Sequence, residues 1–495
     1  MTTRSQTTGT TGTTETTETT GSAETTGSAE TTEAVAALFE ALSRTIPAQR
    51  LITDRDVVAS LSADDAEWAP VGQAALVLRA RSEAEVAEAV RICADLRVPV
   101  VPRGAGTGLS GGANAVDGCL VLDLSKMDEV VEIDGDNLVC VVQPGIVNDD
   151  LKAILHEQGL WYPPDPASAP WSTIGGNVAT NAGGLCCVKY GVTRDYVLGM
   201  RAVMGGPAGY GNVVRLGRRT AKGVAGLDIS GLMVGSEGTL GIVTEVTLRL
   251  RPAPKGTPRT IVGAFGSLVD AGRAVAAVTR RGLTPSALEL LDRECLQAVE
   301  DWKHLGLEAD AQVLLLARVD TPGEGGADEA RAVAAAFEEG DPLWALESSD
   351  DAEAETLFAA RRLAYPALER LGPVLTEDIC VPRSALPTML GMLVEIAARH
   401  GVRMATIAHA GDGNLHPLLL TPPGDDGARE AAQAAFEEML DGAIALGGTV
   451  TGEHGVGLLK RAGMERELDP RSLAVQRAVK QTLDPLNIFN PGKVL

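Results

Sequence analysis

The sequence is short of positive charge. It holds 43 Lys and Arg against 66 Asp and Glu, which gives its 495 residues a formal net charge of −23. Nucleic-acid binding needs a basic surface for the phosphates, so this composition argues against a nucleic-acid partner. It also argues against direct attachment to an anionic membrane surface.

Cysteine is sparse and lacks a metal-binding pattern. The seven cysteines are scattered, and the adjacent pair Cys186-Cys187 is not a CxxC motif. The sequence therefore encodes neither an iron–sulfur ligand set nor a zinc knuckle. Several of these residues lie in apolar strand or helix patterns, which is typical of buried thiols in a cytosolic protein.

Long apolar runs and a signal-peptide pattern are missing too. No apolar stretch is long enough to span a bilayer, and the N-terminus lacks a charged segment followed by an apolar one. We expect a cytoplasmic protein without a transmembrane segment, which reaches the inner face of the membrane only through a partner. Residues 1–33 are almost entirely Thr, Gly, Ser, Ala and Glu, so this tail is predicted to be disordered.

Glycine is concentrated in one stretch, 101–112, which carries five glycines after the apolar run 98–101. Glycine lets a backbone come close to a ligand, and a run of amides in one concavity binds anionic oxygen. The stretch predicts a pyrophosphate-binding loop after a buried strand, with a simple glycine-rich turn as the alternative. It is not a Rossmann loop, because turns and the strand 119–124 follow it instead of a helix. It is not a Walker A loop, because no Gly-Lys-Ser/Thr closes it.

The elements around this loop alternate between helix and strand, which predicts an α/β unit with mixed strand pairing. A helix is expected over 33–42, and a second one begins at the capping box Ser82–Glu85 and has its buried face over 86–94. Strands are expected at 120–124 and 138–142. A third helix is expected to begin at an Asn148 cap and to end at about Gln158. The stretch 162–184 then shows little helix or strand signal, and so long a loop is usually functional. The strand 243–250 closes the unit.

Glycine- and asparagine-rich motifs follow one another along this unit: Arg103–Gly112, Pro164–Pro166, Ile174–Asn177, Asn181–Gly184, Lys189–Gly191 and Gly235–Gly238. In this order they resemble the FAD-linked oxidases of the vanillyl-alcohol-oxidase type, from about residue 50 to the C-terminus. The resemblance implies an α+β fold, with a two-part FAD-binding domain of that type and an α+β cap domain with an antiparallel sheet.

The resemblance also implies where FAD is held. The glycine-rich loop would bind the pyrophosphate, and the later stretches would line the ribityl chain and the isoalloxazine ring. The residues implied are Arg103, Gly104, Ala105, Gly106, Thr107, Gly108, Leu109, Gly111, Gly112, Pro144, Gly145, Pro164, Asp165, Ser168, Gly175, Gly176, Asn177, Asn181, Gly183, Gly184, Tyr190, Gly191, Glu237, Gly238, Gly241, Ile242 and Asn490. No histidine lies in the glycine-rich loop, so we expect FAD to be held there without a covalent bond.

Pro252-Ala-Pro254 breaks the chain and predicts a domain boundary near residue 255. We expect an FAD-binding domain over 34–255, a substrate-binding cap domain over 256–455, and a C-terminal segment, 456–495, that returns to the FAD-binding domain. In the cap, helices are expected on one face of an antiparallel sheet. The pattern predicts strands at 262–265, 312–319, 402–408 and 415–420, and helices at 269–281, up to His304, and at 327–339, 351–363 and 384–399.

Histidine is rare, and half of it lies in two short motifs. Three of the six histidines fall in His409–His416 and Gly452–Gly457. The glycine-rich loop between His409 and His416 can turn both imidazoles toward one point. With Glu453 they suit a divalent metal with an open position for substrate, whether zinc, manganese or iron. Each histidine alone would be interpreted as a core or surface residue; the joint pattern favours the metal site.

The two histidine motifs and the ending Phe489–Lys493 resemble the D-2-hydroxy-acid branch of the same family, in particular bacterial glycolate oxidase flavin subunits and D-lactate dehydrogenases. The resemblance implies a divalent metal, zinc before manganese or iron, on His409, His416 and Glu453. It implies His454 as the general base and Arg361 as the group that binds the substrate carboxylate.

Two positions differ from the D-2-hydroxyglutarate members of that branch. They carry a lysine where this chain has Thr376 and an asparagine where it has Leu418. Both of those residues give polar contacts to a longer diacid. Their absence favours a small monocarboxylate substrate, glycolate or D-lactate.

The sequence thus predicts an FAD-dependent enzyme that oxidises a small D-2-hydroxy acid to its 2-oxo acid. The metal would hold the substrate oxygens and His454 would take the hydroxyl proton, while the hydride leaves for the flavin. Electrons would pass to quinone, an electron-transfer flavoprotein, an iron–sulfur partner subunit or oxygen. The alternatives are oxidation of 2-hydroxyglutarate or another long hydroxy acid, a non-catalytic flavin subunit that relays electrons, and a metal hydrolase without flavin.

Overall fold

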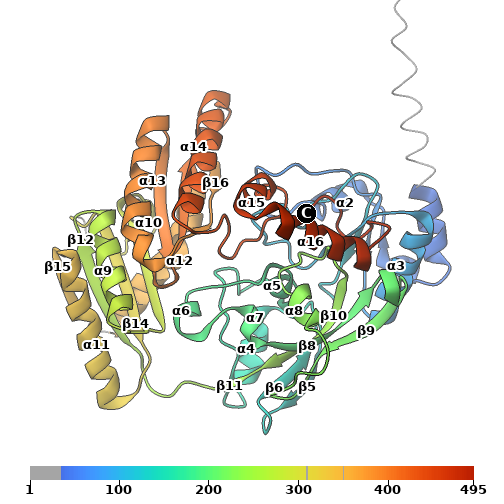
Figure 1. Cartoon of the computed structure of the whole chain (residues 1–495), viewed down its shortest axis with the longest axis horizontal. Helices are drawn as coiled ribbons and strands as arrows, with labels where there is room; N and C mark the ends of the chain where they lie inside the picture. Colours follow the sequence, from blue (N-terminus) through green and yellow to red (C-terminus); the bar gives the residue numbers. More distant parts are fainter. Residues whose placement is uncertain (1–34, 308–309, 349–350) are drawn as a thin grey trace, which may run out of the picture.

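The computed structural model describes residues 35–307, 310–348 and 351–495. Two sheet-bearing regions lie beside each other, and the C-terminal helices lie over the first of them (Figure 1). The tail 1–33, predicted to be disordered, lies outside the described residues.

A four-stranded sheet opens the first region, in the order β1 (Leu51–Ile52), β2 (Leu76–Arg79), β4 (Leu120–Asp123) and β3 (Val100–Arg103). β2, β4 and β3 run parallel, whereas β1 pairs antiparallel with β2. Parallel neighbours need a crossover, which helix α3 (Glu83–Leu96) provides between β2 and β3. The mixed pairing predicted from the sequence is confirmed.

Helices pack on this sheet through the apolar face that the sequence predicts. The Ser82 hydroxyl accepts a hydrogen bond from the Glu85 amide and caps α3, and Val86, Ala89 and Val90 are fully buried. The other helices at this end are a segment over 35–43, the 3-10 turn η1 (Ala48–Arg50) and α2 (Arg55–Ser60).

A five-stranded antiparallel sheet forms the other half of the first region. Its order is β5 (Val130–Asp134), β6 (Val139–Val142), β10 (Ile242–Arg249), β8 (Val197–Met204) and β9 (Asn212–Gly217). The smaller elements around it are α4 (Asn148–His156), η2 (Gly206–Ala208), α8 (Ile229–Met233) and the strand pair β7 (Leu160–Trp161) with β11 (Arg251–Pro252). The long separation between β6 and β10 leaves room for the motif-rich stretch between them.

Two expectations for this region were wrong. Asn148 does not cap α4; Val147 precedes the helix, and the Asn148 side chain instead donates to Asn177 and to the Pro164 carbonyl. The stretch 162–184 contains a helix: the motif Ile174–Asn177 begins α5 (Ile174–Thr180), which Thr173 caps. Glycines at its start hid the helix, since they weaken helix propensity. The short helices α6 (Cys187–Tyr190) and α7 (Thr193–Tyr196) follow.

The cap is an antiparallel sheet with strands from widely separated parts of the chain. The order is β15 (Trp344–Glu347), β12 (Arg259–Phe265), β14 (Val313–Val319), β13 (Ala287–Asp292), β18 (Arg403–His409), β19 (Asn414–Leu420) and β16 (Val374–Thr376), and β17 (Ile379–Cys380) also pairs with β19. Each of these pairings is antiparallel. The predicted antiparallel cap sheet is confirmed.

Helices cover both faces of the cap sheet, so the expectation of one covered face was wrong. One face packs against α9 (Leu268–Arg280), α11 (Gly323–Phe337), α13 (Leu386–His400) and α14 (Asp426–Ala445). The other packs against α10 (Arg293–Lys303) and α12 (Asp351–Glu369). Side chains alternate along a strand, so an apolar strand such as β14 supplies residues to both clusters. The 3-10 turns η3 (Glu338–Gly340), η4 (Arg383–Ala385) and η5 (Ala410–Asp412) connect these elements.

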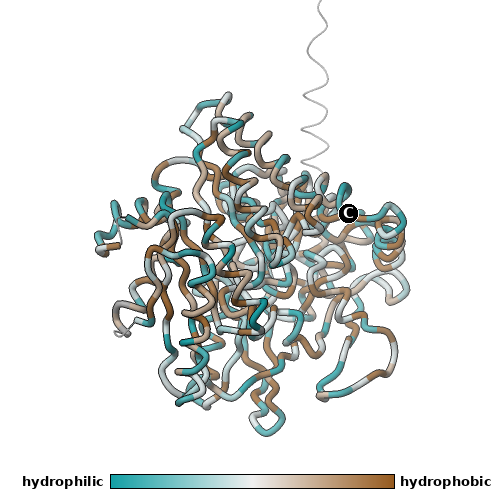
Figure 2. Tube along the Cα trace, turned by 60° about the vertical axis from the view of Figure 1, so that its left-hand side comes forward, coloured by the Kyte–Doolittle hydropathy of each residue, from teal (hydrophilic) through white to brown (hydrophobic). Residues whose placement is uncertain are grey.

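The end of the chain packs on the first region. Helices α15 (Arg461–Glu467) and α16 (Pro470–Leu483) lead to Phe489, which forms a parallel bridge with Val100 at the edge of the four-stranded sheet. Figure 2 shows apolar segments running through the middle of the molecule, with many polar ones at its edge. None of the helices in the described ranges combines the length and apolarity needed to cross a bilayer.

The buried carboxyl of Asp292 should make stability depend on pH. It accepts hydrogen bonds from the amides of Cys295 and Thr406, and burial raises its pKa from 3.8 to about 7. Between about pH 4 and pH 7 the folded chain keeps a proton that the unfolded chain has lost, so the contribution of this group to the free energy of unfolding falls as pH rises. Asp292→Asn should remove this dependence of the free energy of unfolding on pH, which amounts to as much as about 1.4 kcal/mol per pH unit.

Unfolding midpoints of the wild type and of Asp292→Asn, measured from pH 5 to pH 8, test this expectation. Asp301→Asn, at an exposed position of α10, is the matched control and should keep the wild-type slope. Equal slopes for Asp292→Asn and the wild type would show that Asp292 is ionised alike in both states.

Candidate functional site

The glycine-rich loop begins where β3 ends. The amides of residues 104–109 find no hydrogen-bond acceptor among the described residues. Beside them lies a cavity of about 690 Å³, and Ala105, Lys126, Gly145 and Trp171 are part of its lining. Free amides next to a cavity with a cation and an aromatic ring suit a dinucleotide that has an anionic middle and a flat base. The loop therefore fits the pyrophosphate of FAD.

Glycines from distant motifs let three segments meet at this cavity. A Cβ atom on Gly175 would lie 2.6 Å from the Cβ of Pro144, and one on Gly104 would lie 2.2 Å from the Thr173 hydroxyl oxygen. Gly106 has a φ of 85°, which favours glycine, and the Arg103 guanidinium fills the space beside it. The structure thus brings the glycine-rich loop, Pro144 and the start of α5 together.

Several predicted FAD residues hold their own loop instead of facing the cavity. The Asn177 side chain donates to the Ser172 hydroxyl at 3.2 Å, and the Ser168 carbonyl accepts from the Ser172 backbone amide at 2.7 Å. Asp165 accepts from the Cys186 amide at 3.0 Å. Gly176 donates to the Thr173 hydroxyl. These contacts fix the shape of the loop that borders the cavity.

The stretch Asn181–Gly184 connects the first region to the histidine motifs. Asn181 ends α5 in the left-handed conformation, and its side chain accepts from the Arg194 amide. A Cβ atom on Gly183 would lie 2.5 Å from an oxygen of Glu453. The predicted flavin-side loop therefore lies directly against the predicted metal ligand.

Tyr190 lies away from the large cavity. Its hydroxyl donates to Asp320, which also pairs with Lys189, and these residues line a separate cavity of about 290 Å³ with Trp161 and Arg251. Gly191 only ends the short helix α6. This motif joins the first region to the cap.

Glu237 and Asn490 tie the end of the chain to the glycine-rich loop. The Glu237 carboxylate accepts from the amides of Val456 and Gly457 at 2.7 and 2.9 Å, and burial raises its pKa to about 7. The Asn490 side chain donates to the carbonyls of Gly112 and Glu237. Just beyond, Gly238, Gly241 and Ile242 lead into β10.

Lys493 was not predicted from the sequence. Its buried ammonium donates to the Asn114 carbonyl at 2.7 Å and to the Asn490 side chain at 3.2 Å. The motif Phe489–Lys493 was the available signal, but it does not say which loop the lysine reaches.

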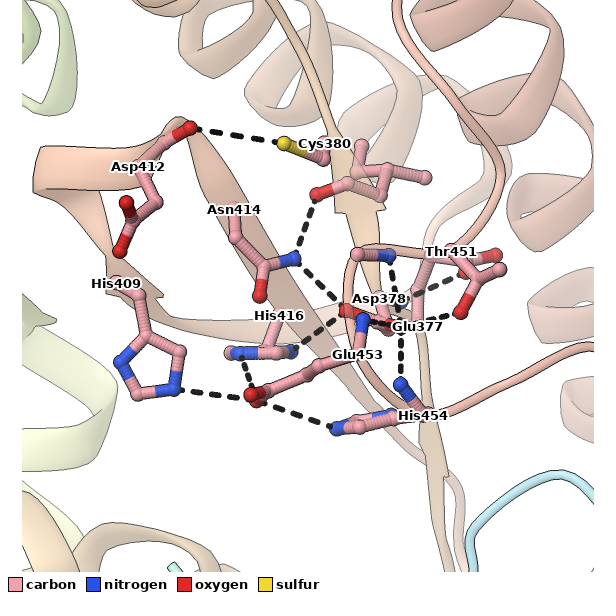
Figure 3. A network of polar contacts seen from close by, with 12 residues as sticks. Glu377, Asp378, Cys380, His409, Asp412, Asn414, His416, Thr451, Glu453 and His454 are labelled. Atoms are coloured by element: carbon pink, nitrogen blue, oxygen red, sulfur yellow. Dashed lines mark hydrogen bonds and ion pairs between the residues drawn. The ribbon is translucent and has the colours of Figure 1, made fainter. Parts of the chain in front are cut away.

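His409 and His416 project from neighbouring strands of the cap sheet. In the antiparallel pair of β18 and β19, Ile407 lies opposite His416. His409 follows Ile407 by two residues along β18, so its side chain lies on the same face of the cap sheet as that of His416. Nε2 of His409 lies 3.1 Å and Nε2 of His416 lies 3.4 Å from Oε1 of Glu453 (Figure 3). The predicted ligands converge, and we call these three residues the His–His–Glu centre.

Charges inside the His–His–Glu centre set its protonation. Burial opposes a charge on His409, but Glu289 and Glu453 outweigh burial and hold the pKa of His409 well above 6.5. Burial also opposes ionisation of Glu453, yet the two imidazoles hold its pKa well below 4.5. A divalent cation would displace the proton from Nε2 of His409, because metal ligands must be deprotonated, and would then meet two imidazole nitrogens and an ionised carboxylate directed at one point.

His454 lies beside the centre without joining it. Its ring stacks on His416, with centroids 4.9 Å apart and planes 11° apart, and Nε2 lies 3.9 Å from Oε1 of Glu453. Burial lowers the pKa of His454 to about 4. An uncharged imidazole at this position can accept a proton.

Asp378, which sequence reasoning missed, holds the loop that carries Glu453 and His454. One of its oxygens accepts from the amides of Gly452, Glu453 and His454 at 2.8–3.0 Å and from the Thr451 hydroxyl at 2.7 Å. The other accepts from the Asn414 side chain. Nearby positive charges hold the pKa of this buried carboxyl below its usual value, although burial acts against them. No spacing in the sequence signals these contacts, because Asn414 lies 36 residues away and the loop residues lie 73 to 76 residues away.

Arg361 is buried beside the centre, where its Nε lies 2.8 Å from Oε2 of Glu289. Glu289, also missed from the sequence, lies opposite His409 in the pairing of β13 and β18. Thr376 and Leu418 lie opposite each other in the pairing of β16 and β19. Leu418 is fully buried and follows His416 by two residues, so the position beside the centre is apolar.

Family models match two parts of this chain. The model described as the FAD binding domain matches residues 74–216, and the model described as FAD linked oxidases, C-terminal domain, matches residues 257–494. The second match includes the His–His–Glu centre, Arg361 and Lys493.

Curated relatives match over most of their length. The glycolate oxidase subunit GlcD of Bacillus subtilis is 41% identical over 419 residues, which cover 84% of this chain and 88% of the relative. The GlcD of Escherichia coli K12 is 34% identical, with 84% and 83% covered. The D-lactate dehydrogenase of Anaerostipes hadrus is 35% identical, with 85% and 89% covered.

Solved structures share the fold at lower identity. 4-Ethylphenol oxidase from Gulosibacter chungangensis has a TM-score of 0.76 at 18% identity, and p-cresol methylhydroxylase has 0.76 at 16%; in each case 93% of this chain and 97% of the other are covered. With the two domain matches and the curated relatives, this settles the family: the chain belongs to the FAD-linked oxidases.

Proposed function

We propose that this FAD-linked oxidase converts a small D-2-hydroxy acid, glycolate or D-lactate, to its 2-oxo acid. The observation that carries the proposal is the His–His–Glu centre, which lies on the cap sheet directly against the flavin-side loop at Gly183. The names of the relatives, glycolate oxidase subunit and D-lactate dehydrogenase, support the same substrate class.

FAD would be held without a covalent bond by the free amides of the glycine-rich loop and by the cavity next to them. When bound, FAD supplies an acceptor for two electrons and a hydrogen from the substrate carbon. The protein contributes placement, because Gly183 brings the flavin-side loop onto Glu453.

The His–His–Glu centre would hold a divalent metal, zinc before manganese or iron. Such a cation supplies positive charge to the hydroxyl and carboxylate oxygens of the substrate. Arg361 adds a second positive group beside it, and its terminal guanidinium nitrogens would bind the substrate carboxylate. Together they offset the strongly acidic chain and allow an anion to bind.

His454 would act as the general base. Oxidation of the alcohol breaks the O–H bond, whose proton His454 accepts, and the C–H bond, whose hydrogen leaves with its electron pair. His454 is suited to this role because its backbone is fixed by Asp378 and its ring by stacking on His416. A base held next to the centre needs no rearrangement before it acts.

The apolar Leu418 and the uncharged Thr376 would limit the substrate to a small monocarboxylate. Neither side chain carries a charge, and they lie opposite each other across neighbouring strands of the cap. A second carboxylate on a longer diacid would be buried there without a cation, which is costly.

The electron acceptor would be another protein or a diffusible molecule. We propose quinone, an electron-transfer flavoprotein or an iron–sulfur partner subunit; two of the relatives are themselves named as subunits. The site of action would be the cytoplasm, at the inner face of the membrane if a membrane-bound partner holds the chain there.

Flavin bleaching without oxygen tests the reaction and its base. D-Lactate or glycolate should reduce the flavin absorbance rapidly, and D-2-hydroxyglutarate should do so far more slowly. His454→Ala should slow reduction about 100- to 10,000-fold, because the alcohol loses its base. His400→Ala is the matched control: this histidine pairs with Glu438 at the far end of α13 and should leave the rate unchanged.

Bleaching by D-2-hydroxyglutarate alone would show that the substrate-size argument from Thr376 and Leu418 is wrong. A yellow protein that none of these acids reduces would favour an electron-relay subunit.

Metal content tests the His–His–Glu centre. His416→Ala should lower bound metal per chain, measured by atomic emission, and slow flavin reduction at least about 100-fold, because one of three ligands is lost. A chelator should lower bound metal and slow flavin reduction in the wild type to the same extent, and added zinc should restore both. His400→Ala should keep full metal content; equal metal in both variants would contradict the proposed ligands.

A further inference from the structure

Glu289 is an ionisable residue in the middle of an apolar strand. It lies on β13 between Leu288 and Leu290, and 1% of its surface is exposed. A carboxylate in such a position is costly unless charged or hydrogen-bonding groups satisfy it. The structure supplies two such groups, and both belong to the site.

One partner of Glu289 is the imidazole of His409. Nδ1 of His409 lies 2.9 and 3.0 Å from the two carboxylate oxygens, and the opposite ring nitrogen, Nε2, lies 3.1 Å from Glu453. A proton on Nδ1 is donated to Glu289, so Nε2 is the nitrogen that faces the centre. The carboxylate thereby sets both the tautomer and the angle of the ring.

The other partner is the guanidinium of Arg361. Its Nε lies 2.8 Å from Oε2 of Glu289, and both side chains are buried. Arg361 comes from α12 and His409 from β18, so the carboxylate adds a polar link between the helix and the ligand strand, which also pack through apolar side chains. This contact is an ion pair without hydrogen-bond geometry at Nε, and its charge attraction holds the guanidinium beside Glu289.

We propose that Glu289 is a positioning residue that aligns a metal ligand and the substrate-binding arginine at the same time. The inference rests on the proposed function and gives Glu289 a role that stability alone does not require. Buried ion pairs contribute little net stability, because desolvation offsets the attraction, and apolar replacements are often as stable.

The proposal predicts a joint effect on two properties. Glu289→Gln keeps the size of the side chain but removes its charge and directs an amide N–H toward one of its two donors. We expect the Kd for zinc, measured on metal-free flavoprotein against a chromophoric chelator, to rise about 10- to 100-fold. The KM for D-lactate or glycolate should rise about tenfold or more, since Arg361 loses its anchor.

Two further variants separate the partners. Arg361→Lys keeps a positive charge but not the guanidinium geometry, so it should raise KM and leave the zinc Kd within about threefold. Asp292→Asn is the matched control, a buried carboxyl three residues further along the same strand whose partners are backbone amides. It should shift the unfolding midpoint and leave both the zinc Kd and KM unchanged.

The proposal is overturned if Glu289→Gln lowers only the unfolding midpoint while zinc Kd and KM stay within about twofold of the wild type. If that variant does not fold, Glu289→Asp, which keeps the charge but is one methylene shorter, must change zinc Kd and KM in the same directions. A wild type that binds zinc but oxidises none of the hydroxy acids would refute the proposed function, and the zinc Kd of Glu289→Gln would still decide the role of Glu289. A wild type that binds none of zinc, manganese and iron would overturn the proposed role of Glu289, and flavin reduction by the hydroxy acids would then decide the proposed function separately.

Discussion

The site depends on one loop that is held from both sides by buried carboxylates. Asp378, from the cap, accepts the amides of residues 452–454, and Glu237, from the first region, accepts those of residues 456 and 457. Hydrogen bonds from amides to an ionised carboxylate such as Asp378 are short and strong, and together with those to Glu237 they define the path of the backbone between the two regions. The Glu453 and His454 side chains are placed by this path, and the cofactor side and the substrate side are aligned through it.

The site contains buried positive groups although the chain as a whole is strongly negative. A chain with a net charge of −23 collects positive groups at the centre, where His409 and Arg361 are buried. Each is matched to a carboxylate, so none is an isolated buried charge. Local fields at short range outweigh the distant surface charge, which solvent ions screen. A bound divalent cation would add the positive charge that such a site needs to attract a small anion.

The sequence allowed the prediction of residues that act through short motifs, and missed those that act across the fold. His409, His416 and Glu453 converge as expected, because glycine-rich motifs limit how the chain turns around them. Glu289 and Asp378 could not be predicted, since each is an ordinary acidic residue until tertiary pairing brings its partner near. The two covered faces of the cap sheet could have been found: a continuous apolar run such as residues 313–317 of β14 is typical of a strand buried on both sides.

The return of residues 489–494 to the first sheet has a consequence for biosynthesis. The Asn490 side chain donates to the Gly112 carbonyl across 378 residues, and Lys493 reaches Asn114 across 379. Domains fold as units as they emerge from the ribosome. The whole cap sheet is therefore translated before these contacts can form, so it can close on its own strands first. Until Phe489, Asn490 and Lys493 have been made, a nascent chain exposes the edge of the four-stranded sheet and the glycine-rich loop without their neighbours.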